Sequence, residues 1–168
     1  MFLIETERLK ITEFTPDMAY MVHRNSLDED NRRFVPDEVF ETEAEALETI
    51  EFLMTQYGDC NGPRVYPILL SDNTNIGYVQ AVPLEDTWEI GYHIAKAYTG
   101  KGYASEAVRA FLPVIMPELN LQQIEGVCLE ENLASRKVME RSGFVLIYKG
   151  IGDYQGEKRQ ICRYRFKL

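Results

Sequence analysis

The stretch EIGYHIAKAYTGKGYASEAV, residues Glu89–Val108, decides the fold because it joins a strand pattern to a helix pattern through a glycine-rich turn. The alternation begins one residue earlier and gives the strand two faces, Trp88, Ile90, Tyr92 and Ile94 on one and Glu89, Gly91, His93 and Ala95 on the other. Beyond the turn, apolar residues recur at spacings of three and four from Ala104 to Ile115. The stretch therefore predicts a strand, a turn and a helix in direct succession.

The glycine-rich turn lies between the end of this strand and the beginning of the helix. The first N–H groups of a helix have no partner within it, and Gly100 and Gly102 let the backbone approach an anion closely. Lys96 and Lys101 add positive charge. The turn is thus a candidate phosphate site, although a glycine-rich turn without a ligand explains the spacing equally well. A nicotinamide dinucleotide site is a more distant alternative, because Ser105 stands where that motif has its third glycine.

Length and charge limit what the chain can do. At 168 residues with 45% hydrophobic content, it has the size of one domain, which we expect to span residues 1–168. A formal net charge of −9 weighs against a nucleic acid as partner and favours a cationic one. No apolar run is long enough to cross a bilayer, and the first residues lack the pattern of a signal peptide. We therefore expect a cytoplasmic protein without membrane contact.

The three cysteines, Cys60, Cys128 and Cys162, are widely spaced along the chain. None belongs to a CxxC pair or stands with a histidine at the spacing of metal ligands. We therefore expect reduced thiols, with neither a disulfide framework nor a metal site.

The rest of the chain also alternates between strand and helix patterns. Strands are expected at residues 8–14, 65–70, 75–82, 88–95, 123–129, 144–149 and 160–166, and helices at 16–22, at 43–57, from 103 onward and at 132–142. Pro113 is expected to kink or end the third helix near Leu112. Residues 152–158 are expected to form a hairpin loop. This order predicts an α/β (α+β) fold with a mixed, mostly antiparallel sheet of about seven strands and about four flanking helices.

Two motifs together resemble the GCN5-related N-acetyltransferase (GNAT) superfamily. They are the stretch quoted above and ENLASRKVMERSGF at Glu131–Phe144, and the opening IETERLKI at residues 4–11 looks like the branch of ribosomal-protein alanine N-acetyltransferases. The resemblance covers nearly the whole chain. It implies the GNAT fold, in which the fourth and fifth strands splay apart to admit the pantetheine arm of acetyl-coenzyme A (acetyl-CoA). It also implies that the loop after the fourth strand wraps the pyrophosphate.

The resemblance implies that the coenzyme is held by the strand end, the turn and the beginning of the last helix. The residues at the matching positions are Ile94, Ala95, Thr99, Gly100, Lys101, Gly102, Tyr103, Ala104, Asn132 and Ser135. Backbone N–H groups around Ile94 and Ala95 would face the oxyanion of the reaction. Thr99 departs from the family pattern, which has arginine or glutamine there. Asn132 either contacts the pantetheine or only caps the helix.

Transfer to an amine requires a base, because an ammonium group must lose a proton before its nitrogen can attack a thioester. Related enzymes often carry a glutamate base at the position of Glu89, and His93 on the same face is the alternative. Many relatives place a tyrosine that acts as general acid seven residues after the asparagine, where this chain has Met139. Ser135 matches a serine of the ribosomal branch and is assigned the hydroxyl near the sulfur.

The resemblance implies an acetyl-CoA-dependent N-acetyltransferase that works without a metal, by direct attack of a primary amine in a ternary complex. The acceptor would be a protein N-terminal α-amine or a small-molecule amine, and the acidity of the chain suits a cationic one. Residues 25–40 and 153–158 are the variable parts expected to choose it. The alternative is a noncatalytic domain that binds or senses acyl-CoA. The chain is expected to be a monomer or a homodimer.

Overall fold

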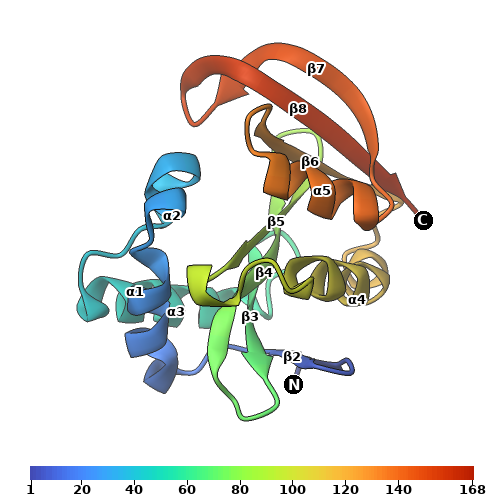
Figure 1. Cartoon of the computed structure of the whole chain (residues 1–168). Helices are drawn as coiled ribbons and strands as arrows, with labels where there is room; N and C mark the ends of the chain where they lie inside the picture. Colours follow the sequence, from blue (N-terminus) through green and yellow to red (C-terminus); the bar gives the residue numbers. More distant parts are fainter.

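The computed structural model describes residues 1–168 as an open sheet with helices on both faces (Figure 1). The strands are β1 (Leu3–Glu5), β2 (Leu9–Thr12), β3 (Arg64–Leu70), β4 (Asn75–Pro83), β5 (Trp88–Ile94), β6 (Gln123–Leu129), β7 (Val145–Tyr154) and β8 (Glu157–Lys167). The α-helices are α1 (Ala19–Ser26), α2 (Glu29–Phe34), α3 (Glu43–Gln56), α4 (Tyr103–Glu118) and α5 (Leu133–Arg141). Short 3₁₀ turns are η1 (Pro16–Met18), η2 (Pro36–Glu38) and η3 (Lys96–Tyr98).

The sheet has the order β1-β2-β3-β4-β5-β6-β8-β7, and all neighbouring strands are antiparallel except β5 and β6. The predicted fold class, a mixed and mostly antiparallel sheet, is confirmed. The sheet has eight strands because β1 adds a short edge strand before β2, and there are five α-helices because α2 forms within the segment expected to be variable.

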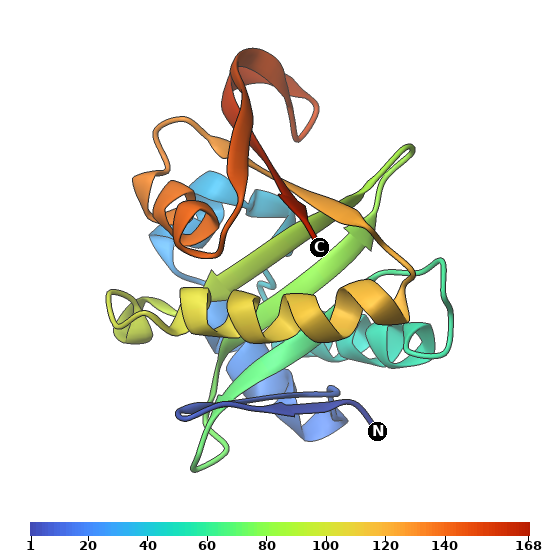
Figure 2. The same cartoon turned by 90° about the vertical axis from the view of Figure 1, so that its right-hand side faces the viewer.

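Apolar side chains fill both faces of the sheet. In Figure 2, α4 crosses one face of the sheet in front, and α1 and α3 lie behind. The larger core cluster includes the helical stripe that the sequence predicted, Ala107, Val108, Phe111, Leu112 and Ile115, each at most 2% exposed. A smaller cluster, made of Phe14, Ala19, Ile50, Leu53 and Val65, holds α1 and α3 against β3. None of the helices combines the length and the apolar character that crossing a bilayer requires.

Helix α4 does not end near Leu112, which was one of the two outcomes expected of Pro113. It continues through Pro113 and Pro117 to Glu118. Both prolines are exposed rather than part of the buried stripe. The carbonyl groups that lose an N–H partner to a proline therefore lie on the solvent side, where water can satisfy them. Burial of the opposite face stabilises the helix enough to offset the missing bonds.

The hairpin of β7 and β8 is longer than predicted, and the expected loop at residues 152–158 is wrong. Both strands continue to a turn of two residues, Gln155 and Gly156, with φ angles of 49° and 80°. Turns with two positive φ angles match the twist of paired strands, so they allow a tight connection. The hairpin extends from the edge of the sheet to a point above α2 (Figure 1).

Strands β5 and β6 diverge almost from their first residues. Their one paired position is Glu89 opposite Glu125, although each strand has seven residues. On its other side, β5 pairs along its whole length with β4. The sheet is therefore open on one side of β5, where the resemblance implies a splay.

Gly77 allows β4 to lie close to the end of β5. A Cβ atom at Gly77 would lie 1.9 Å from the carbonyl oxygen of His93 and 2.9 Å from its carbonyl carbon. These are rigid backbone atoms, so no side-chain movement can make room for a methyl group. The backbone that leads into the glycine-rich turn is thus fixed by a contact that only glycine permits.

Gly77→Ala is expected to destabilise the protein by about 3 kcal/mol, the upper end of the usual range for overpacking, because the new methyl group overlaps backbone that cannot move aside. Urea denaturation followed by circular dichroism measures this. Gly58→Ala is the matched control, since no atom lies within 4 Å of a Cβ there. Equal stability of the two variants would contradict the assignment.

Candidate active site

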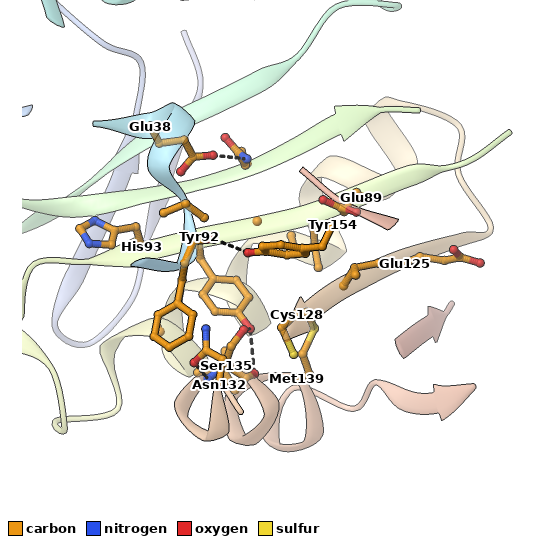
Figure 3. A pocket seen from close by; sticks show the side chains of 18 of the residues that line it. Glu38, Glu89, Tyr92, His93, Glu125, Cys128, Asn132, Ser135, Met139 and Tyr154 are labelled. Atoms are coloured by element: carbon orange, nitrogen blue, oxygen red, sulfur yellow. Dashed lines mark hydrogen bonds between the residues drawn. The ribbon is translucent and has the colours of Figure 1, made fainter. Parts of the chain in front are cut away.

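A cavity of about 890 Å³ lies at the divergence of β5 and β6 (Figure 3). Six of the predicted site residues line it: Glu89, Ile94, Thr99, Ala104, Asn132 and Ser135. The other predicted residues, Ala95, Gly100, Lys101, Gly102 and Tyr103, are not part of its lining; Ala95 stands between Ile94 and Lys96, and the other four lie in the turn between Thr99 and Ala104. The structure thus gathers the strand end, the turn and the last helix around one space.

The turn before α4 has the geometry of an anion site. Gly100 and Gly102 have φ angles of 76° and 81°, in the left-handed region that other residues rarely adopt. No side chain caps the N-terminus of α4, a helix of 16 residues. Its first backbone N–H groups can therefore bind a phosphate, and the helix dipole favours negative charge there. The Thr99 hydroxyl donates to the carbonyl oxygen of Lys96 at 2.8 Å, so it closes the preceding turn.

Arg8 supports this turn from the beginning of the chain. Its Nη1 donates to the carbonyl oxygen of Lys101 at 2.9 Å, and its Nε donates to Glu106 at 2.7 Å. The guanidinium group lies 4.4 Å from the centre of the Tyr103 ring. No sequence pattern predicted this role, and the one signal was the place of Arg8 in the opening motif.

Backbone donors on β5 face the opening. The Ala95 N–H donates to the carbonyl oxygen of Ile76 at 2.8 Å, so the expectation that Ala95 supplies an oxyanion donor is corrected. Hydrogen-bonded positions alternate along an antiparallel pair. The N–H groups of Ile94, Tyr92 and Ile90 therefore point away from β4 and toward β6. Ile90 follows Glu89, the one residue of β5 that is paired with β6, so its N–H belongs to that pairing. The N–H groups of Ile94 and Tyr92 are the donors available to an acyl group in the cavity.

The beginning of α5 brings two hydroxyl groups together. The Asn132 side chain accepts a hydrogen bond from the Ser135 N–H at 3.1 Å, so Asn132 caps the helix. The Tyr92 hydroxyl lies 2.9 Å from Ser135 Oγ and 2.9 Å from the Ser135 carbonyl oxygen. Burial raises the pKa of Tyr92 well above its usual value, which keeps the phenol protonated. The sequence placed Tyr92 on the correct face of the strand but gave it no chemical role.

Met139 has a packing role at the position where relatives have a tyrosine. Its side chain is 2% exposed, and a Cβ atom on Gly126 would lie 2.2 Å from Met139 Cε. The methionine thus fills the space that Gly126 leaves between α5 and β6. Tyr92 and Ser135, which line the same cavity, both carry hydroxyl groups.

Glu89 lies on the other side of β5 from Tyr92, Ser135 and Asn132 (Figure 3). Burial raises the pKa of Glu89 to about 7; the charge of Glu38 adds to the rise and Arg163 opposes it. A carboxyl group with this pKa is ionised in about half of the molecules at neutral pH, and its carboxylate is a stronger base than that of an ordinary glutamate. The group is therefore suited to accept a proton from an ammonium ion.

Carboxyl groups dominate the wall of the cavity. Eight acidic side chains line it against three cationic ones, and of the latter Arg165 is paired with Glu125 at 2.7 Å. His93 Nε2 lies 3.2 Å from Asp28 Oδ2, so the histidine is already engaged with a carboxylate. The charge of the wall favours a cationic molecule.

Segments far apart in the chain enclose the cavity. The Tyr154 hydroxyl at the tip of the β7–β8 hairpin donates to the carbonyl oxygen of Phe34 at the end of α2. Arg33 of α2 pairs with Glu131 before α5 at 2.9 Å. Helix α2 and the hairpin thus form a wall opposite β5, and both belong to the segments that the sequence predicted to be variable.

Metal-ligating and thiol side chains were the other candidates for a reactive group. No group of three His, Cys, Asp or Glu side chains is placed to hold a metal ion. The three cysteines are free, and Cys128 and Cys162 are buried. Burial raises the pKa of the Cys128 thiol to about 11, so it stays protonated and is a poor nucleophile.

Comparison with known proteins agrees with this geometry. Residues 8–145 match the family described as the acetyltransferase (GNAT) domain. The uncharacterized N-acetyltransferase YnaD of Bacillus subtilis is 34% identical over 142 residues, which are 83% of this chain and 81% of that protein. An acetyltransferase of the GNAT family from Bacillus anthracis is 28% identical, with a TM-score of 0.83 over 99% of this chain and 98% of that one. RimL, a ribosomal L7/L12 α-N-protein acetyltransferase solved in complex with coenzyme A, shares the fold at 17% identity, with a TM-score of 0.84 over 99% and 98%.

Gly102→Ala is expected to weaken coenzyme A binding about tenfold, because alanine disfavours the left-handed conformation by about 1–2 kcal/mol and the turn would relax away from it. Isothermal titration calorimetry with coenzyme A measures the dissociation constant. Gly156→Ala, which also replaces a glycine of positive φ with open space around it, is the control at a distant turn. Unchanged affinity in Gly102→Ala would contradict a phosphate site at this turn.

The raised pKa of Glu89 predicts a stability that depends on pH. Its folded pKa of about 7 exceeds its ordinary value of 4.5, so the stability contributed by the protonated group is complete below 4.5 and is lost as the pH rises through about 7. Glu89→Gln keeps the shape without the charge. We expect its stability relative to the wild type to increase by roughly 1–3 kcal/mol between about pH 5 and about pH 8. Urea denaturation at both pH values tests this, and a constant difference would contradict it.

Proposed function

This chain belongs to the acetyltransferase (GNAT) family and is an N-acetyltransferase, and from that premise we propose that it transfers acetyl from acetyl-CoA to a primary amine by direct attack in a ternary complex. Acetyl-CoA is the acyl donor of the family and supplies the thioester. The turn at Gly100–Ala104 would hold its pyrophosphate, and the gap between β5 and β6 would admit its pantetheine arm.

The raised pKa of Glu89, set by its burial in the cavity wall, is the observation that carries the proposal. The carboxylate lies beside the opening of the sheet, on a wall whose charge suits an ammonium ion. His93 is the weaker candidate for the base, because its ring is held by Asp28. Glu89 would therefore take the proton that frees the nitrogen lone pair of the acceptor.

The other groups would act on the carbonyl and on the sulfur. As the C–N bond forms, charge on the carbonyl oxygen would be met by N–H groups of β5, from Ile94 or Tyr92. As the C–S bond breaks, the Ser135 hydroxyl would donate a proton to the thiolate while the Tyr92 phenol keeps its hydrogen bond to Ser135. The second proton of the amine nitrogen would pass to water, and water would return one proton to Ser135, so the products are an amide and a free thiol.

The two departures that suggested a noncatalytic domain have structural explanations. Met139 packs on Gly126, while Tyr92 and Ser135 supply the hydroxyl groups. The Thr99 hydroxyl closes the η3 turn, and Arg8 holds the glycine-rich turn through the carbonyl oxygen of Lys101. Neither departure removes a group that the proposed chemistry needs.

The proposed acceptor is a cationic primary amine. RimL acts on a ribosomal protein, and its similarity to this chain lies in the fold. The acidic wall suits a protein N-terminal α-amine and a small-molecule amine alike. Its shape is set by α2, η2 and the β7–β8 hairpin.

Glu89→Gln is expected to lower kcat by about 100-fold or more, because a positioned general base contributes at least that much. The wild-type kcat/KM should rise with pH through an inflection near 7, where Glu89 ionises. Thiol release with acetyl-CoA and a panel of primary amines measures both quantities. Glu85→Gln, which replaces an exposed glutamate on the cavity rim, is the control. A Glu89→Gln variant with at least a third of the wild-type rate would contradict the assigned base.

A further inference from the structure

A second cavity of about 230 Å³ adjoins the first on the side of α1, α3 and η2. The two cavities share five lining residues, which form the partition between them: Asn31, Glu38, Tyr78, Gln80 and His93. The acetyl-transfer chemistry proposed above uses none of these side chains. We call the second cavity the side pocket.

Three buried polar atoms of the side pocket have no hydrogen-bond partner. They are Asn31 Oδ1, Glu38 Oε2 and Asn75 Nδ2. The orientation of the Asn31 amide is fixed, because its Nδ2 donates to the carbonyl oxygens of Ser26 and Glu38 at 2.9 and 3.2 Å. Asn31 is 2% exposed, so its free acceptor faces the interior. Buried polar atoms in proteins nearly always have partners, so unpaired ones here mark a place for a ligand group or water.

Glu38 lies between the two cavities and is held there by Gln80, whose side chain occupies the space above Gly91. A Cβ atom there would lie 2.6 Å from Gln80 Nε2, so the glutamine crosses β5 at a point that only glycine leaves free. Gln80 Nε2 then donates to Glu38 Oε1 at 3.4 Å (Figure 3). Gly91 lies between Glu89 and His93 on the same face of the strand. Gln80 thus reaches Glu38 from a point on β5 that lies two residues, a rise of about 7 Å, from the proposed base.

The charges around Glu38 leave it without a cationic partner. Burial raises the pKa of Glu38, and the neighbouring Asp37 adds to the rise. His93 opposes it, but the ring of His93 is bound to Asp28. Glu89, the other carboxyl group nearby, repels Glu38. A buried carboxylate with carboxylates on both sides is costly unless a cation joins it.

The far side of the side pocket is apolar. It is lined by Phe14, Val22, Phe40, Ile50, Leu53 and Val65. A ligand group that fits this space has a cationic donor near Glu38 and Asn31 and methylene groups around it. An alkylammonium group has this character, because it offers three N–H donors at the end of an apolar chain. A hydroxyl group would leave the charge of Glu38 uncompensated.

We propose that Glu38 and Asn31 form a second recognition site, which binds a second ammonium group of the acceptor while the first is acetylated beside Glu89. The inference rests on the proposed function and narrows the acceptor to a molecule with two primary amines joined by an apolar spacer. The spacing along β5 corresponds to roughly four to six methylene groups. The ammonium would donate to Glu38 Oε2 and Asn31 Oδ1, the two acceptors that are unpaired in the structure.

The test compares linear α,ω-diamines with linear monoamines of the same length in the wild-type enzyme. We expect kcat/KM for the best diamine to exceed that of its monoamine by about 10- to 100-fold, the usual size of a hydrogen bond to a charged group. Peptides beginning with lysine and with norleucine form a second pair, which distinguishes a side-chain ammonium of a protein from a small diamine. A preference in either pair supports a second ammonium site. Equal kcat/KM within both pairs would overturn it.

Glu38→Gln is the variant that localises the site, because glutamine can still bond Gln80 but carries no charge. We expect the ratio of diamine to monoamine kcat/KM to fall close to one. Glu48→Gln, which removes an exposed charge from α3 and lines neither cavity, should keep the wild-type ratio. Thermal denaturation checks that both variants fold. An unchanged ratio in folded Glu38→Gln would overturn the role of Glu38.

Binding measured without turnover separates this inference from the proposed function. Calorimetry of 1,5-diaminopentane and pentylamine is performed on the enzyme saturated with coenzyme A. Tighter binding of the diamine without turnover of any amine would contradict the acetyl transfer but support the second ammonium site. Turnover of both amines with equal affinity would leave the acetyl transfer in place and contradict the second site.

Discussion

The geometry of the candidate active site depends on β5 and β6, two strands that pair at one position and then separate. β5 and β6 meet at Glu89 opposite Glu125, and their backbones separate beyond that point. An unpaired strand edge inside a sheet leaves N–H and C=O groups without partners, which is unfavourable unless another polar chain bonds them. In this fold the free edge is the place where an extended substrate can lie. The opening is stable because β5 is fully paired with β4 on its other side, and the hairpin of β8 and β7 continues the sheet beyond β6.

The two sides of β5 perform different tasks because side chains alternate along a strand. On one side, Tyr92 reaches Ser135 at the beginning of α5. On the other side, Glu89, Gly91 and His93 face α2 and η2, where the acidic residues gather. In the proposed reaction, this single strand would separate the thiol end of the coenzyme from the nitrogen of the acceptor, and its backbone would face the carbonyl group.

The sequence predicted those features that depend on neighbours in the chain. Alternation predicted β5 and its two faces, the stripe from Ala107 to Ile115 predicted α4, and the order of the two patterns placed the glycine-rich turn at the beginning of that helix. It did not predict contacts between distant segments, such as Arg8 with Lys101 or Gln80 with Glu38. Proline and loop rules failed at Pro113 and at residues 152–158, because tertiary burial and strand pairing outweighed local preference. Ala95 lost its expected role through a backbone bond to Ile76 that spacing alone does not reveal.

The bond between Tyr154 and the carbonyl oxygen of Phe34 has a consequence for how such a protein can diverge. It joins two segments that contribute little to the main core, a six-residue helix and the tip of a hairpin. Mutations there can reshape the acceptor wall while the coenzyme side of β5 remains under separate constraint. Gene duplication could therefore produce enzymes that share one acyl donor and differ in the amine that they modify.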